Sequence, residues 1–237
     1  MEITPLGDSA LIVRVRDRFE DAPEKTLSEV LDVFRRLENA SIPGVIELAA
    51  AYTTVVVFFD PIRVINHAVE PDRVIEWLTQ KIYEGLTPDK RRQYGRAVAR
   101  VVEIPVCYDP EFALDLDHVA QNAKISPKEV VDLHGAAGYH VSCLGFTPGF
   151  PYLAGLPEKL TTPRRATPRK EVPAGSVAIA GTQSGIYSLR SPGGWNVIGR
   201  TPLRLFEPQK NPPTLLRTGD RLRFRAISRQ EFDAWSF

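Results

Sequence analysis

The chain has 237 residues, enough for one large domain or two ordinary ones, and its 43% hydrophobic content supports proper cores. A net charge of +1, with both signs well mixed, gives no electrostatic reason to expect nucleic acid or an anionic membrane as a partner. With two cysteines, no signal-peptide pattern and no apolar run near the ~20 residues that span a bilayer, we expect a cytoplasmic protein with neither a disulfide framework nor a zinc site.

The first part of the chain alternates strand and helix patterns. They follow in the order strand, helix, strand, strand, helix, strand, at 11–16, 21–37, 45–49, 54–59, 71–83 and 98–106. Asp21, a proline and Glu24 form the pattern of a capped helix start. Strand 54–59 is apolar on both faces, which is typical of a central strand. We therefore predict an N-terminal α/β domain over 1–92 with split-βαβ (ferredoxin-like) order, which the strand at 98–106 completes.

The second part has a different pattern. The polar segment 87–96 is the expected linker to a domain over 93–237. Ser126 opens a capped helix with proline at its first position, and we expect Gly135 or Gly138 to end it. Short alternating segments between Gly and Pro turns are clearest at 177–180 and 221–226. They predict a β-barrel or a β-sandwich.

The segment 144–200 stands out because Gly, Pro and aromatic residues are concentrated in it. Gly permits positive φ and close approach, and Pro fixes φ, so this density indicates many individually specified backbone positions. Interleaved aromatic residues argue against low-complexity disorder. We expect an ordered, loop-built surface that carries function.

Three motifs in this segment, GFTPGFPYL, VPAGSVAIAG and SPGGWNVIGRTP, together with GDSALIV, EIPVCYDPEF and EVVDLH elsewhere, resemble the family of 5-oxoprolinase B subunits. The family is also called KipI-like, formerly allophanate hydrolase subunit 1. The resemblance covers nearly the whole chain and implies an α+β protein with an N-terminal α/β domain and a C-terminal cyclophilin-like β-barrel domain.

The resemblance also implies a function. It is that of a subunit, inactive alone, of an ATP-dependent 5-oxoprolinase, which opens 5-oxo-L-proline to L-glutamate. The implied partners are a homologous barrel subunit (the KipA-like C subunit) and a LamB/YcsF-like subunit. Two alternatives stay open: a KipI-like inhibitor of a sensor histidine kinase, and a carboxyltransferase-like subunit of urea or allophanate metabolism.

Lactam hydrolysis needs an acid–base group and an anion site. His134 matches the family's LH motif and is the acid–base candidate, with capping of its helix by a protonated imidazole as the alternative. Arg164, Arg169 and Arg200 are candidates for a carboxylate or phosphate clamp, or for local ion pairs such as Arg169 with Glu171.

ATP, the implied cofactor, is expected to be used by the complex and not held by this chain alone. Residues 194–201 nearly fit the P-loop pattern, but the apolar residues inside and the following proline predict a turn and a strand. Gly193-Gly194 and Ala174-Gly175-Ser176 form either backbone anion nests or plain turns. Cys143 lacks a base and is interpreted as core.

We take His134, Arg169 and Arg200 as candidate catalytic residues. The candidate substrate-binding residues are Phe146, Pro148, Gly149, Phe150, Gly175, Ser176, Gln183, Tyr187, Gly193, Gly194 and Trp195. Three of these aromatic residues and Tyr152 line a substrate cleft or a subunit interface, or they pack in a core, and as a group we favour the interface; the four are Phe150, Tyr152, Tyr187 and Trp195. No metal site is expected, because the histidines lack ligand spacing.

Overall fold

The computed structural model describes residues 1–19, 21–67, 69–87 and 100–235. The chain divides into two compact units, Met1–Val98 and Ala99–Phe237. The predicted boundary between residues 92 and 93, and all of the predicted linker beyond Thr87, lie outside the described residues. Within the described ranges, no helix is long and apolar enough to cross a membrane.

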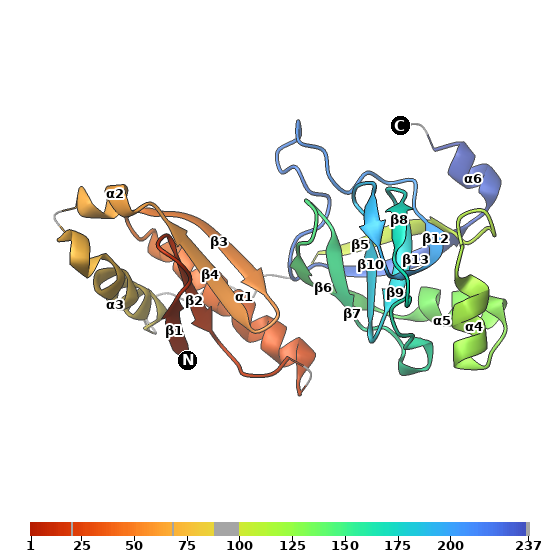
Figure 1. Cartoon of the computed structure of the whole chain (residues 1–237), viewed down its shortest axis with the longest axis horizontal. Helices are drawn as coiled ribbons and strands as arrows, with labels where there is room; N and C mark the ends of the chain where they lie inside the picture. Colours follow the sequence, from red (N-terminus) through yellow and green to blue (C-terminus); the bar gives the residue numbers. More distant parts are fainter. Residues whose placement is uncertain (20, 68, 88–99, 236–237) are drawn as a thin grey trace. The chain divides into compact units, whose positions relative to one another are not determined.

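The first unit is an antiparallel sheet packed against helices (Figure 1). Its elements are β1 (Glu2–Pro5), β2 (Ala10–Arg14), α1 (Pro23–Ala40), β3 (Val45–Ala51), β4 (Thr54–Phe59), α2 (Pro61–Ile65), the 3-10 turn η1 (Pro71–Arg73) and α3 (Val74–Leu86). The strand order is β1-β2-β4-β3, so β4 is central, as its apolar sequence predicts. Val55, Val57 and Phe59 form its buried face and share one core with residues of α1 and α3.

The strand predicted at 98–106 does not complete this sheet. Its described part, β5 (Val101–Cys107), belongs to the second unit. The edge beside β2 is instead taken by β1, which pairs antiparallel with β2 from Glu2↔Arg14 to Pro5↔Leu11. A short hairpin closes at little entropic cost. Four residues that include a proline are too short a pattern to predict this strand, and the split-βαβ order is wrong in that element.

The second unit is a closed barrel of seven strands in the order β10-β7-β6-β13-β5-β12-β9. Besides β5, these are β6 (Tyr139–Leu144), β7 (Pro151–Ala154), β9 (Ser176–Ala180), β10 (Gln183–Ile186), β12 (Asn196–Arg200) and β13 (Arg221–Ile227). Among the described strands of the barrel, β13 and β5 are the one parallel pair. The barrel alternative is therefore confirmed, and segment 144–200, expected to be loop-built, forms most of its strands.

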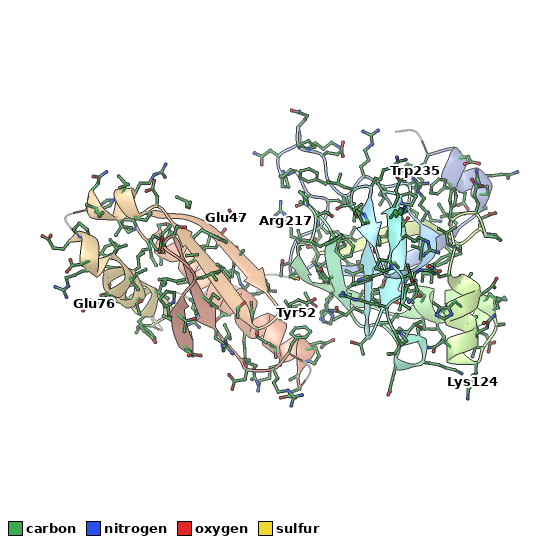
Figure 2. All side chains as sticks on the ribbon, in the orientation of Figure 1. Glu47, Tyr52, Glu76, Lys124, Arg217 and Trp235 are labelled. Atoms are coloured by element: carbon green, nitrogen blue, oxygen red, sulfur yellow. The ribbon has the colours of Figure 1, made fainter. Side chains whose placement is uncertain are left out.

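Helices and a small sheet surround the barrel. They are α4 (Leu116–Ala123), α5 (Pro127–Ala136), the 3-10 turn η2 (Glu158–Leu160), α6 (Arg229–Asp233) and the two-stranded sheet of β8 (Arg169–Val172) with β11 (Ser191–Gly193). α4 packs on α5 and β12, and α5 packs on β13. Lys124, labelled in Figure 2, ends α4 in a left-handed conformation with φ 54°.

The sequence predicted one of two helix starts correctly and did not predict the last residue of α5. Ser126 begins α5 with both bonds of a capping box, as predicted. α1 begins after Ala22, which gives no side-chain cap, so the predicted cap at Asp21 is wrong. α5 ends at Ala136, so Gly135 lies inside it and Gly138 beyond it, and neither glycine is its last residue.

The two faces of β9 support two different clusters. Val177 and Ile179 belong to the aliphatic core that fills the barrel. Ala178 and Ala180 point the other way, since successive side chains alternate in a strand, and they pack in a separate, largely aromatic cluster outside the barrel. The three family motifs converge on this second cluster.

Candidate functional site

The outer aromatic face consists of Phe146, Phe150, Tyr152, Tyr187 and Trp195. Phe150 lies at its centre, with ring centroids 5.0 Å from Tyr152, 5.3 Å from Tyr187 and 5.5 Å from Trp195, all edge to face. Edge-to-face geometry is the favoured arrangement of aromatic rings. Phe150, Tyr187 and Trp195 are buried, while Tyr152 is half-buried. The face is therefore a packed aromatic layer with an accessible edge.

Small residues beneath the rings make this packing possible. A Cβ placed on Gly185 of β10 would lie 2.9 Å from both Phe150 and Trp195. A Cβ on Gly193 would lie 2.1 Å from the Tyr187 hydroxyl oxygen. These glycines are required by close approach of the rings, which explains part of the glycine density of the segment.

Phe146 is the exposed member of the face. Its side chain is 62% exposed, yet its ring lies 5.6 Å from Phe150 and 6.4 Å from Tyr187. Its φ is 65°, a left-handed conformation that a non-glycine residue rarely adopts. The tight turn is held by Gly145 N–H donating to Phe150 O at 3.1 Å and Phe150 N–H donating to Thr147 O at 3.0 Å. Strain of this kind, on an exposed aromatic residue, points to function.

Arg164 lies at the other side of the face. Its guanidinium carbon is 5.9 Å from the Trp195 ring centroid, within reach of a cation–π contact. The residue is exposed, and no ion pair joins it to a carboxylate in the part of the chain that the structure describes. Burial raises the pKa of the half-buried Tyr152 hydroxyl, and the nearby charge of Arg164 opposes that effect.

Arg169, a predicted catalytic residue, forms an ion pair with a buried carboxylate. Its two terminal nitrogens donate to Asp115 at 2.6 and 2.9 Å, and Arg165 donates to the same carboxylate at 2.5 Å. The Val197 amide adds a bond of 2.8 Å. Burial raises the pKa of Asp115, but the bonds from Arg169 and Val197 outweigh it, so the pKa lies below its usual value. The expected partner Glu171 pairs with Arg190 instead.

His134, the predicted acid–base residue, is fully buried among aromatic rings. Its ring stacks on Phe224 with centroids 4.3 Å apart. Nδ1 lies 2.8 Å from the Tyr108 hydroxyl, and Nε2 lies 3.2 Å from Ser184 Oγ, which itself donates to Ala178 O. The chain of bonds fits a neutral ring that donates from Nε2.

Burial without a carboxylate partner lowers the pKa of His134 to about 3. The alternative of a protonated helix cap is therefore wrong, although His134 does lie in the last turn of α5. The surroundings indicate a structural role, in which a neutral imidazole joins α5 to strands β9 and β10.

Arg200, the third predicted catalytic residue, lies at the end of β12, away from the aromatic face. Its Nε donates to Ala174 O at 3.0 Å, and its guanidinium lies 5.6 Å from the Phe112 ring centroid. Burial, together with the like charge of Arg190, lowers its pKa. It is a half-buried cation, but it does not meet Arg169 or His134 in one site.

The other glycine-rich positions serve the fold. Gly175 N–H donates to Tyr187 O and Ser176 N–H to Pro173 O, so these amides are not available to an anion. Gly194 O accepts from the amide of Arg165. Residues 196–200 form strand β12, which leaves the near P-loop pattern without its phosphate-binding helix. These segments do not fit a nucleotide site of the P-loop type.

Three further predicted residues lie around the aromatic face. Pro148 is exposed in the turn that carries Phe146, and the buried Gly149 follows it. Gln183 is half-buried on β10 two residues from Gly185, which places both on one face of the strand. The structure thus gathers the predicted aromatic residues and separates them from His134 and Arg200, while Ser176 O accepts a hydrogen bond from the amide of Tyr187 at 2.9 Å.

Asp115, Arg165, Tyr108 and Ser184 are important residues that the sequence did not single out. Asp115 lies 50 residues before Arg165, and nothing in its local sequence distinguishes it from the exposed Asp117. Among the described residues, no group of three or more His, Cys, Asp or Glu side chains is placed to hold a metal ion.

Known proteins are similar to this chain in sequence. Residues 1–216 match the family model "Carboxyltransferase domain, subdomain C and D". The chain is 42% identical to the 5-oxoprolinase B subunit of Bacillus subtilis (strain 168) over 235 residues, covering 99% of this chain and 96% of that protein. It is 39% identical to the 5-oxoprolinase B subunit of Escherichia coli O157:H7, covering 92% and 93%.

Solved structures are similar as well. The protein TTHA0988 has 36% sequence identity and a TM-score of 0.75, and the match covers 92% of this chain but 40% of that one. A conserved uncharacterized protein from Pyrococcus horikoshii has 38% identity and a TM-score of 0.55, with 98% and 100% covered.

Proposed function

The chain belongs to the family of 5-oxoprolinase B subunits, and from this premise we propose that it is a non-autonomous, cytoplasmic subunit of an ATP-dependent 5-oxoprolinase. The complex would hydrolyse 5-oxo-L-proline to L-glutamate. Its other members would be a homologous barrel subunit (the KipA-like C subunit) and a LamB/YcsF-like subunit. The outer aromatic face would be this chain's contribution to the site.

One observation carries the proposal: Phe146 is held exposed, with φ 65°, on a packed aromatic layer. The ring contacts Phe150 and Tyr187 but remains largely exposed, which supports a ligand or partner group as its counterpart. A flat lactam ring presents an apolar body and a polar rim, which suits an aromatic surface with nearby polar groups.

The same geometry supports dependence on partners. The lactam is an unreactive amide, and its hydrolysis needs an activated acyl group and proton transfer. On the aromatic face, the hydroxyl pKa values of Tyr152 and Tyr187 are raised by burial, so neither is suited to act as a base near neutral pH. This chain would bind and orient the substrate, and ATP would be bound elsewhere in the complex.

Reconstitution tests the proposal. The chain is mixed with the two partner proteins of the same organism, and glutamate release from 5-oxoproline is followed with and without ATP. We expect release only from the complete mixture with ATP. Absence of turnover from a mixture shown by size-exclusion chromatography to be assembled would reject the proposed function, and turnover by this chain alone would reject its dependence on partners.

The same preparations address the alternative of kinase inhibition. If the chain slowed autophosphorylation of a cognate sensor histidine kinase while the assembled mixture left 5-oxoproline unchanged, the regulatory alternative would replace the oxoprolinase proposal.

A further inference from the structure

We propose that Arg164 is the carboxylate-recognition residue of the outer aromatic face and that it makes the site selective for a small cyclic carboxylate. The inference rests on the proposed function for the identity of the ligand, 5-oxoproline. It goes further by naming one residue of this chain that contacts the substrate and the group that it binds.

Three arginines lie within six positions of the chain, and the fold uses two of them. Arg165 and Arg169 both bind the buried Asp115. Arg164 points elsewhere, with its guanidinium over Trp195 at 5.9 Å. Arg165 and Arg169 already satisfy the buried Asp115, and no carboxylate among the described residues pairs with Arg164, so its N–H donors can bind a group from outside the chain.

The backbone around Arg164 is fixed on both sides. Asn196 Nδ2 donates to Pro163 O at 2.8 Å, directly before it. Arg165 N–H donates to Gly194 O at 2.8 Å, directly after it. The Asp115 ion pairs hold the same loop from beneath. An arginine presented by a pinned loop loses less conformational entropy on binding than one on a free loop.

The surroundings match one class of ligand. The guanidinium of the exposed Arg164 lies over the Trp195 ring, and its positive charge lowers the pKa of the hydroxyls of both Tyr152 and Tyr187 against the effect of burial. Tyr152 and Phe146 are the accessible rings there. A planar guanidinium beside aromatic walls fits a carboxylate attached to a small flat ring, because the fork binds the carboxylate bidentately while the ring packs on the aromatic edges.

The test compares four forms of this chain within the reconstituted complex: wild type, Arg164→Gln, Arg164→Lys and Arg223→Gln. Arg223 is an exposed arginine on β13 and serves as the matched control. We expect Arg164→Gln to raise the KM for 5-oxoproline by about 10- to 100-fold, the worth of a charge-assisted bidentate pair. Arg164→Lys keeps the charge without the fork and should give an intermediate KM, and Arg223→Gln should behave as wild type.

A second readout separates recognition from a general structural effect. The substrate 2-pyrrolidinone has the same lactam ring without the carboxylate. Wild type should prefer 5-oxoproline, and Arg164→Gln should lose this preference while its turnover of 2-pyrrolidinone stays within about twofold of wild type, since an exposed substitution leaves the fold intact. An unchanged KM and an unchanged preference in Arg164→Gln would overturn the inference and leave the proposed function standing.

Binding to the isolated chain keeps the inference testable if the complex shows no turnover. The Trp195 indole N–H resonance, assigned with Trp195→Phe, is followed while 5-oxoproline is added. A shift that Arg164→Gln abolishes and Arg223→Gln retains would support the carboxylate site even though the proposed function had failed. Absence of any shift, together with absence of turnover, would reject both.

Discussion

The two faces of strand β9 support layers of different chemistry. Inside the barrel, Val177 and Ile179 join a largely aliphatic core, and the buried His134 is hydrogen-bonded through both of its ring nitrogens. Outside, Ala178 and Ala180 pack against the aromatic rings of the outer face, and Arg164 lies beside its exposed edge. The inner layer buries its side chains, as a stable core does, whereas the outer layer contains the exposed Phe146 in a left-handed backbone conformation. The difference supports our proposal that the outer layer carries the function.

Truncation inside the barrel is expected to have the largest effect on stability. Ile179 is fully buried in the inner core, so Ile179→Ala should lower the free energy of unfolding by about 2–5 kcal/mol through lost burial and a cavity. Urea denaturation measures the change. Ile179→Val removes one methylene and should cost about 0.5–1.5 kcal/mol. A loss below about 0.5 kcal/mol for the alanine variant would mean that the inner layer is not the stabilising core.

Asp115 connects the outer layer to the barrel, and its loss should cost about 3 kcal/mol because two arginines lose a buried partner. Its pKa is lower in the folded state, so its contribution is present above the unfolded pKa near 4 and is lost as pH falls through the folded value. Asp115→Asn should therefore be less stable than wild type at pH 7, and the difference should shrink as pH falls below about 4. Equal stability of the two proteins at pH 7 would contradict the arrangement.

His134 should make the inner layer sensitive to acid. Its folded pKa is about 3, below the ordinary value near 6.5, so its stabilising contribution is complete above pH 6.5 and declines as pH falls. As pH is lowered from 6.5 to 4.5, the free energy of unfolding of wild type should decrease. The control His118→Gln, which replaces an exposed histidine, should show the same decrease, and His134→Gln should show a smaller one. A limb of the turnover pH profile that disappears in His134→Gln would instead restore the acid–base hypothesis.

Local sequence patterns predicted the barrel better than they predicted the site. The alternation at 177–180 and the capping box at Ser126 are short-range signals, and both are present in the structure. The four-residue strand β1 gave too short a pattern, so the first sheet was completed with the wrong strand. Chain position alone did not reveal that β5 pairs with β13, which lies more than a hundred residues away.

The candidate site was harder to predict from the sequence, because the roles of its residues depend on which side chains share a partner. No local sequence pattern distinguishes the arginines at 164, 165 and 169. In the structure, Arg165 and Arg169 bind the buried Asp115, and Arg164 is left exposed beside Trp195. His134 is fully buried, and nothing in its local sequence indicates that burial. The aromatic residues, by contrast, were identifiable from their density between glycines.

Phe146→Ala, measured beside Ile179→Val in the reconstituted complex, tests the division between the layers most directly. Phe146 is 62% exposed, so its truncation should change the free energy of unfolding by less than about 0.5 kcal/mol, yet 5-oxoproline turnover should fall about tenfold or more. Ile179→Val should show the reverse, with lower stability and unchanged turnover. Wild-type turnover in Phe146→Ala would contradict the assignment of function to the outer aromatic face.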